Sequence, residues 1–212
     1  MRPYLKDPGA IYAASFATVR AEARLDRFDP GMQALAIRLI HACGMIEIAD
    51  RITHSRGAYE AGQRALAAGA PILCDCTMVA AGIIRRSLPA GNAVDVTLND
   101  PRVPAMAGDL GTTRSAAAVD LWQDRIEGAV VAIGNAPTAL FHLLERLDQG
   151  WPRPALILGF PVGFVGAAES KAELAARPRG CDFIALRGRR GGSAIASAAV
   201  NALAAGLPGE TP

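Results

Sequence analysis

The spacing of apolar and polar positions changes about one third of the way along the chain. Before that point the pattern is helical, and Asp7-Pro8 and Asp29-Pro30 each place an N-cap carboxylate before a proline at the first helical position. Gly44 follows the second helical stretch, and a glycine there is typical of a helix C-terminus. Three helices are therefore predicted in this part, over about Pro8–Arg24, up to Cys43, and over Gly57–Ala68.

From Pro71 onwards, short apolar runs alternate with helical stretches. The apolar runs, which predict buried strands, are Ile72–Cys74, Val94–Leu98, Ala129–Ile133, Ala155–Leu158 and Phe183–Leu186. The candidate helices are Thr77–Arg86, Thr112–Glu127, Pro137–Gln149, Ala168–Arg177 and Gly192–Ala205. Apolar strands separated by helices favour a parallel sheet that is covered on both faces. Right-handed crossovers between the strands then give a doubly wound α/β sandwich.

The expected fold class is therefore α/β. It is a three-layer α/β/α sandwich with a mostly parallel five-stranded sheet and an N-terminal helical segment. We expect a single domain over residues 1–212, in which the helices of residues 1–69 pack on a doubly wound core of residues 70–206. A chain of this length is long enough to bury a full hydrophobic core.

Composition and charge exclude several classes of protein. Hydrophobic residues make up 51% of the chain and charged residues 20%, which excludes a disordered chain. The formal net charge is only +2, whereas nucleic-acid binding needs a clear positive excess, so no nucleic-acid partner is expected. The apolar stretches are too short or too broken for a membrane span, and the N-terminal residues lack a signal core. A cytoplasmic protein without a membrane partner is expected.

The basic residues are unusual in kind rather than in number. Of the 22 basic residues, only Lys6 and Lys171 are lysines. A GC-rich genome accounts for most of such an arginine excess. The functional interpretation is that a few arginines bind carboxylates or phosphates through two parallel hydrogen bonds, which lysine does poorly.

Ligands of doubly wound sheets bind beyond the carboxyl ends of the strands, and here three of the five ends contain glycine. Gly159–Lys171 looks at first like a dinucleotide-binding fingerprint, but it follows the fourth strand instead of the first, and the next strand ends beside Arg187 instead of an acidic residue. Gly188–Ser193 precedes a helix and offers backbone N–H groups to an anion. The cysteines have no zinc-type spacing, so no metal site is predicted; they are Cys43, Cys74, Cys76 and Cys181.

Three histidines are candidates for proton transfer. His54 lies in a polar segment, which favours a surface position, and His142 lies in a predicted helix, which favours a packed or surface position. His41 falls in the last turn of the second helix, where the negative end of the helix dipole favours the protonated imidazole. Arg38, three residues earlier on the same helix surface, opposes that effect.

Seven segments in order along the chain carry a family resemblance. They are Ala10–Phe16, His41–Gly44, Gly69–Asp75, Thr113–Ala117, Val131–Leu140, Gly159–Lys171 and Arg187–Ser193. Together they resemble the precorrin-8X methylmutase family of cobalamin (vitamin B12) biosynthesis. The resemblance extends over about residues 4–203, and this ordered set is far more specific than any single motif.

The resemblance implies an isomerase that moves one methyl group from C-11 to C-12 of a contracted tetrapyrrole. Precorrin-8X would become hydrogenobyrinic acid without a cofactor. The resemblance also implies a homodimer with its active site near the subunit interface, and hand-over of the tetrapyrrole to other enzymes of the pathway. His41 matches the family's proton donor. The positions expected to bind the substrate are Ser15, Arg20, Asp75, Thr77, Arg114, Asn135 and Lys171.

Two other functions stay open at this point. A non-catalytic tetrapyrrole carrier would use the same arginines, with His41 merely packed. A nucleotide-binding oxidoreductase is suggested by the glycines of Gly159–Lys171 alone. Whether the macrocycle carries cobalt, and what His142 does, also stay open.

Overall fold

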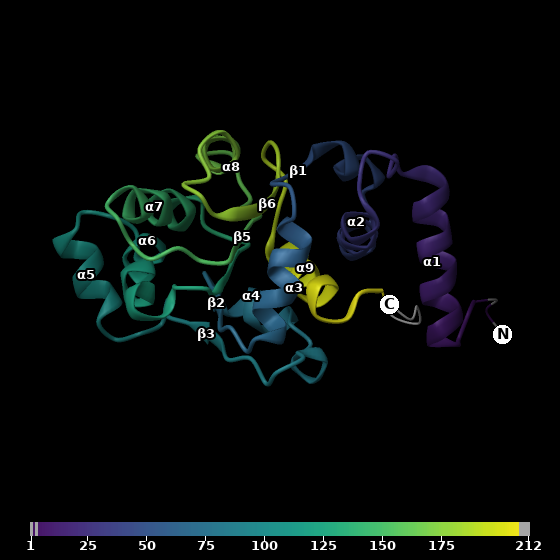
Figure 1. Ribbon diagram of the computed structural model, residues 1–212, viewed down its shortest axis with the longest axis horizontal. Coiled ribbons are helices and arrows are strands. Elements are labelled where there is room, and N and C mark those ends of the chain that lie inside the picture. The colour runs from purple at the N-terminus through teal and green to yellow at the C-terminus, as the bar shows by residue number, and fades with distance from the viewer. Residues whose placement is uncertain (1, 3, 208–212) are drawn as a thin grey trace.

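A six-stranded sheet forms the centre of the molecule (Figure 1). The computed structural model describes residue 2 and residues 4–207. In this part of the chain the strands are β1 (Ile52–His54), β2 (Ile72–Cys74), β3 (Val94–Val96), β4 (Val130–Ile133), β5 (Leu156–Gly159) and β6 (Asp182–Leu186). Their spatial order is β1-β6-β5-β4-β2-β3. All neighbours run parallel except β1, which pairs antiparallel with β6.

Helices cover both faces of the sheet, so the predicted three-layer α/β/α sandwich is confirmed. One face is covered by α2 (Pro30–Cys43), α3 (Ala58–Ala67), α4 (Thr77–Gly82) and α9 (Ser193–Ala205). The other is covered by η3 (Ala118–Arg125), α7 (Pro137–Asp148) and α8 (Ala167–Ala176). The remaining helices are α1 (Pro8–Glu22), η1 (Ile46–Arg51), η2 (Arg85–Ser87), α5 (Val103–Asp109) and α6 (Arg114–Ala117).

The alternation of side chains along the central strands explains the two-sided core. Leu156 and Leu158 of β5 face the α9 side, whereas Ile157 faces the α7 side, and all three are fully buried. Successive strand residues point to opposite faces, so a strand covered on both sides must be apolar throughout. Burying each such side chain stabilises the fold by about 1.5–3 kcal/mol.

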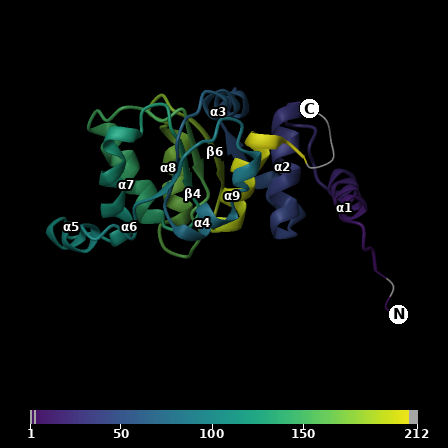
Figure 2. The same cartoon turned by 90° about the horizontal axis from the view of Figure 1, so that it is seen from below.

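The N-terminal helices begin as their caps predict. The Asp7 carboxylate accepts a hydrogen bond from the backbone N–H of Ala10 at 2.8 Å, and Asp29 accepts one from Met32 at 2.9 Å. Gly44 ends α2 in the left-handed conformation, with φ of 68°. In Figure 2, α1 lies at one end of the molecule, outside α2 and away from the sheet.

Several predicted elements are corrected by the structure. The sheet has six strands instead of five, because the prediction missed the three-residue strand β1. His54 belongs to that strand, and it is half-buried beside the Phe28 ring instead of lying on the open surface. The helix expected over Thr77–Arg86 ends at Gly82, and α5 was not predicted. None of the described helices is both long and apolar enough to cross a membrane.

Candidate active site

Asp75 organises the loop that follows β4. Its carboxylate is buried and accepts hydrogen bonds from the backbone N–H groups of Gly134, Asn135 and Ala136, at 3.0, 2.9 and 2.8 Å. Burial raises the pKa of Asp75, although the three N–H donors act in the opposite direction. Asp75 therefore holds the loop at the carboxyl end of β4 in one shape, and the Asn135 side chain of that loop is exposed.

Lys171 joins the two glycine-rich loops at the same edge of the sheet. It lies on α8 and is only 1% exposed. Its Nζ donates to the carbonyl of Pro161 at 2.9 Å and to that of Arg190 at 2.5 Å. Burial lowers the pKa of Lys171 to about 8. The structure thus places the polar atoms of Asp75 and Lys171 against backbone, and their direct contact with a substrate stays a prediction.

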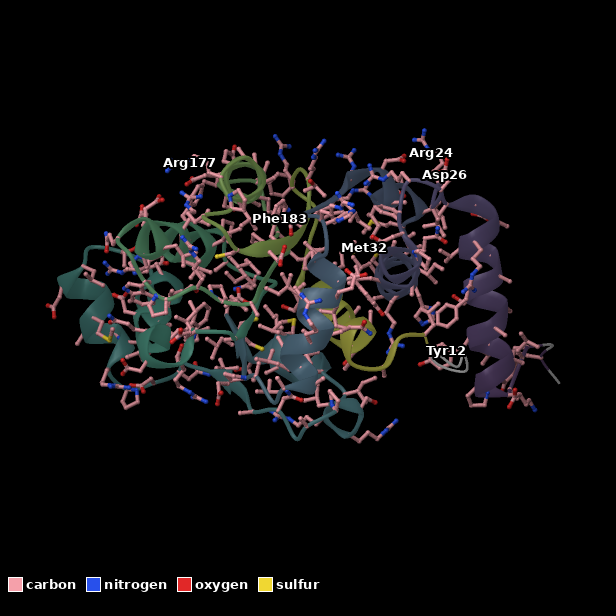
Figure 3. The ribbon with its side chains drawn as sticks, viewed as in Figure 1. Tyr12, Arg24, Asp26, Met32, Arg177 and Phe183 are labelled. Atoms are coloured by element: carbon pink, nitrogen blue, oxygen red, sulfur yellow. The ribbon has the colours of Figure 1, made fainter. Side chains whose placement is uncertain are left out.

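His41 lies at the end of α2, against α1. The Ser15 Oγ of α1 is 2.8 Å from His41 Nδ1. The Tyr12 and Phe16 rings lie 5.3 and 5.4 Å from the imidazole, centroid to centroid, and Tyr12 lies between α1 and α2 in Figure 3. Two residues that the sequence places 26 positions apart thus meet across a helix pair.

The pKa of His41 moves against the direction that the helix dipole favours. Burial lowers the pKa of His41, and the positive charge of Arg38 lowers it further. Arg38 thus acts on His41 in the direction that the sequence predicts, and burial adds to its effect.

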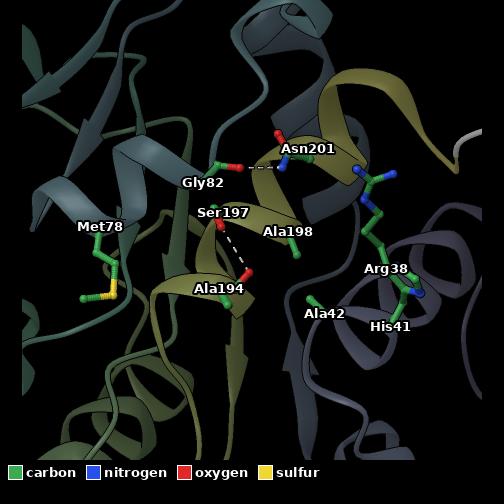
Figure 4. Close-up of a pocket in the computed structure, with 9 residues that line it drawn as sticks. All are labelled: Arg38, His41, Ala42, Met78, Gly82, Ala194, Ser197, Ala198 and Asn201. Atoms are coloured by element: carbon green, nitrogen blue, oxygen red, sulfur yellow. Dashed lines mark hydrogen bonds between the residues drawn. The ribbon is translucent and has the colours of Figure 1, made fainter.

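Two cavities meet at His41. The first holds about 340 Å³ between α2, α4 and α9, and its lining is drawn in Figure 4. It is lined by Arg38, His41, Ala42, Met78, Gly82, Ala194, Ser197, Ala198 and Asn201. The second holds about 310 Å³ between α1 and α2, and Ser15 and Glu22 are among its lining residues. His41 thus lines both cavities.

The other predicted site residues are spread over the molecule. Thr77 begins α4 next to Met78 of the first cavity, and its Oγ1 accepts from Asn99 Nδ2 at 3.4 Å. Arg20 is exposed on α1, and Arg114 is exposed at the start of α6. Figure 1 shows α1 and α6 at opposite ends of the molecule. One chain therefore brings Ser15 to His41, but it does not bring Arg114 to them.

His142 lies away from this site. Its Nε2 is 2.8 Å from the Asp120 carboxylate, which also accepts from Arg146 Nε at 2.6 Å and Nη2 at 2.9 Å. These residues belong to α7 and η3, on the face of the sheet opposite α2 and α9. The contacts give His142 a packing role in an ion-pair cluster.

Sequence reasoning missed most of the lining of the first cavity. Asn201 and Met78 lie on α9 and α4, which are far from α2 in the sequence, so no local motif indicates that they line one cavity with His41. Arg38 had a signal, because it is the charged residue within the otherwise apolar run 35–40 of α2. Among the described residues, no group of three or more His, Cys, Asp or Glu side chains is placed to hold a metal ion.

Comparison with known proteins gives a consistent answer. The sequence model of the precorrin-8X methylmutase family matches residues 10–205. A precorrin-8X methylmutase of Pseudomonas aeruginosa is 61% identical over 204 residues, covering 96% of this chain and 98% of that protein. A cobalt-precorrin-8 methylmutase of Priestia megaterium is 34% identical over 203 residues, covering 95% and 89%. A crystal structure of precorrin-8X methyl mutase from Thermus thermophilus has a TM-score of 0.82 and 40% identity, covering 92% of this chain and 95% of that one.

The α/β/α fold and these relatives define an isomerase of cobalamin biosynthesis. The chain belongs to the precorrin-8X methylmutase family. Family membership favours the enzyme over both the non-catalytic carrier and the nucleotide-binding oxidoreductase.

Proposed function

We propose that the protein moves a methyl group from C-11 to C-12 of precorrin-8X to give hydrogenobyrinic acid, with His41 as the proton donor. The observation that carries this proposal is the position of His41, which is held by Ser15 at the junction of two cavities. A 1,5-shift of a methyl group changes no oxidation state and needs no nucleophile. Protonation of the conjugated ring system lowers the charge that develops during the shift.

The Ser15 contact supports a defined role for each ring nitrogen of His41. When the Ser15 hydroxyl donates to Nδ1, the hydrogen of the neutral ring sits on Nε2. A second proton enters at Nδ1, where the Ser15 hydroxyl turns to accept from it. The imidazolium then donates its Nε2 proton to the macrocycle and returns to a neutral ring with its hydrogen on Nδ1. The lowered pKa of His41 makes this imidazolium a stronger acid than an ordinary histidine, which favours transfer to a weakly basic ring atom.

The remaining predicted residues divide into two groups. Arg20 and Arg114 are exposed and carry guanidinium groups that suit the carboxylate side arms of the substrate, and the exposed Thr77 and Asn135 add polar groups beyond the carboxyl ends of β2 and β4. Asp75 and Lys171 act by shaping the loops that a flat ring approaches. Ser15 joins the first group through His41.

A homodimer completes the site in this proposal. Ser15 lies on α1 and Arg114 on α6, at opposite ends of the folded molecule, yet both are expected near one macrocycle (Figure 1). A second copy can bring its own Arg114 toward His41 of the first. The exposed apolar side chains of Tyr4, Leu5 and Ile11, in and before α1, offer a surface that a partner would cover.

We propose the cobalt-free macrocycle as the substrate. The supporting observation is the difference in similarity: 61% identity to a relative described as acting on precorrin-8X, and 34% to one described as acting on cobalt-precorrin-8. Supplying both substrates in parallel assays tests this choice. Faster turnover of the cobalt form would overturn it.

The central experiment is incubation with authentic precorrin-8X, followed by absorption spectroscopy and mass measurement. The expected result is a changed visible spectrum with an unchanged mass. His41→Ala is expected to lose turnover while still binding hydrogenobyrinic acid, whereas the control His54→Ala keeps turnover. Product binding without turnover by the wild-type protein would favour the carrier, and heat released on titration with NAD(P) would favour the oxidoreductase.

A further inference from the structure

We propose that Arg38 binds a carboxylate side arm of the substrate in the first cavity, and that this pairing couples substrate binding to the protonation of His41. The inference rests on the proposed function, because it takes the substrate to be a polycarboxylate and His41 to be the proton donor. It assigns to Arg38 a binding role that neither the motifs nor the resemblance gave it.

The position of Arg38 is unusual for an arginine. It lies on α2 three residues before His41, so the two side chains share a helix face, and both line the cavity of about 340 Å³. Figure 4 shows both side chains on the side of α2 that faces α9. The Arg38 residue is only 8% exposed.

The Arg38 guanidinium has no acidic partner within residues 4–207. Its one hydrogen bond in that part of the chain goes to the carbonyl of Gly206 at 3.5 Å, the outer limit for such a bond. Other arginines are satisfied differently: Arg146 pairs with Asp120, and Arg179 pairs with Asp148. Burial lowers the pKa of Arg38, which reflects the cost of holding this charge away from water. A carboxylate in the cavity would offset that cost.

The rest of the cavity fits an apolar body that carries one anionic arm. Asn201 donates to the carbonyl of Gly82 and accepts from the N–H of Ile84, and Ser197 donates to the carbonyl of Ala194. These polar side chains are therefore already occupied. The other lining residues, Ala42, Met78 and Ala198, are apolar. Arg38 and His41 are left to meet a charged group, and the planar guanidinium suits a carboxylate.

The coupling follows from the charges that face His41. α2 contributes Arg38, α1 contributes Tyr12 and Glu22, η1 contributes the neutral Ile46, and the cavity residues of α4 and α9 are neutral. The positive charge of Arg38 lowers the pKa of His41. A carboxylate docked on Arg38 cancels this charge, so His41 takes up its proton as the substrate arrives.

The test compares Arg38→Met, which keeps the apolar stem but removes the charge, with Arg38→Lys, which keeps the charge but removes the fork. Arg24→Met, at an exposed ion pair with Asp50, is the matched control. Two quantities are measured: the Kd of hydrogenobyrinic acid by absorption titration, and the pKa of His41 by NMR with and without the product.

Arg38→Met is expected to weaken product binding by about tenfold to 100-fold, the effect of losing a charge-assisted hydrogen bond. The pKa of His41 should rise in the product-free variant, and its further rise on product binding should shrink. Arg38→Lys should bind with intermediate affinity and keep the low pKa of His41. Wild-type affinity and an unchanged His41 titration in a folded variant of either kind would overturn the inference. Failure of the wild-type protein to convert precorrin-8X would instead overturn the proposed function. The product affinities and the His41 titrations would still test whether Arg38 binds a carboxylate.

Discussion

Ser15 Oγ and His41 Nδ1 lie 2.8 Å apart and join α1 to the last turn of α2. Because α1 packs on α2 and lies away from the sheet, this contact fixes the imidazole from the outer side of the molecule. The Tyr12 and Phe16 rings restrict the same imidazole from two further directions. The helix pair thus holds one ring in one orientation, which is what directional proton transfer requires.

Ser15→Ala should lower kcat by about tenfold to 100-fold with little change in KM, because the ring loses the partner that sets its orientation and tautomer. Steady-state kinetics with precorrin-8X measures both constants. Thr18→Ala is the matched control, since Thr18 lies on the same helix and its hydroxyl donates to the carbonyl of Ala14 at 3.0 Å. A kcat equal to that of the control would remove Ser15 from the mechanism.

The pH dependence should reflect the lowered pKa of His41. A proton donor must be protonated, so kcat/KM should fall as pH rises, with a midpoint below the ordinary histidine value of 6.5.

The lowered pKa of His41 also affects the stability of the folded protein. The folded state disfavours the charged ring, so the contribution is fully present above pH 6.5 and is lost as pH falls through the folded pKa. The pH profile of kcat/KM for the wild type tests the first statement, and denaturation of wild type and His41→Gln over the same pH range tests the second. A kcat/KM midpoint above 6.5 would contradict the lowered pKa.

Asp75→Asn should loosen the loop after β4. The single oxygen of the asparagine amide can still accept a hydrogen bond. The NH₂ group that replaces the other oxygen would face backbone N–H groups that now have no acceptor. The expected loss of unfolding free energy is about 1–3 kcal/mol, measured by urea denaturation, with faster hydrogen exchange at residues 134–136. Asp95→Asn, at a half-buried ion pair with Arg125, should change stability far less. Equal losses in the two variants would refute the special role of Asp75.

Local signals predicted the elements that are held by local contacts. The caps Asp7 and Asp29 and the end at Gly44 all depend on residues within one helical turn, and the structure has each of them. The strand Ile52–His54 was missed because its pairing partner, β6, is about 130 residues away and nothing in three residues encodes that contact. Its antiparallel edge position also allows a polar composition, which weakens the strand pattern.

The site could be predicted only in part, for the same reason. The resemblance gave His41 and Ser15, but the first cavity exists because α2 packs on α9 some 160 residues later in the chain. The glycine-rich loops were interpreted as places where backbone approaches a ligand. The structure shows that Gly191 is needed for a close approach between two parts of the protein itself.

Lys171→Met should destabilise the protein by about 1–3 kcal/mol at pH 7, because two carbonyl acceptors lose their donor. The folded pKa, about 8, lies below the ordinary value of 10.5, so the charged form is disfavoured by folding. The stability of wild type relative to the variant should therefore increase as pH rises from 8 to 10.5. The neutral amine keeps two N–H donors for the two carbonyls. Denaturation at pH 7, 8 and 10 measures the difference, and a decrease over this range would contradict the assignment.

Gly191→Ala should destabilise the loop junction more than an ordinary loop substitution does. A Cβ at this position would lie 2.2 Å from the carbonyl oxygen of Phe160 and 2.6 Å from that of Pro161, so backbone itself must move. Gly108→Ala is the control, because a Cβ there meets nothing within 4 Å and lies in α5, where alanine is expected to stabilise by about 0.5–1 kcal/mol. Thermal denaturation and product titration should therefore show a lower Tm and weaker binding for Gly191→Ala alone. If both variants behaved alike, the close approach at Gly191 would not constrain the two loops.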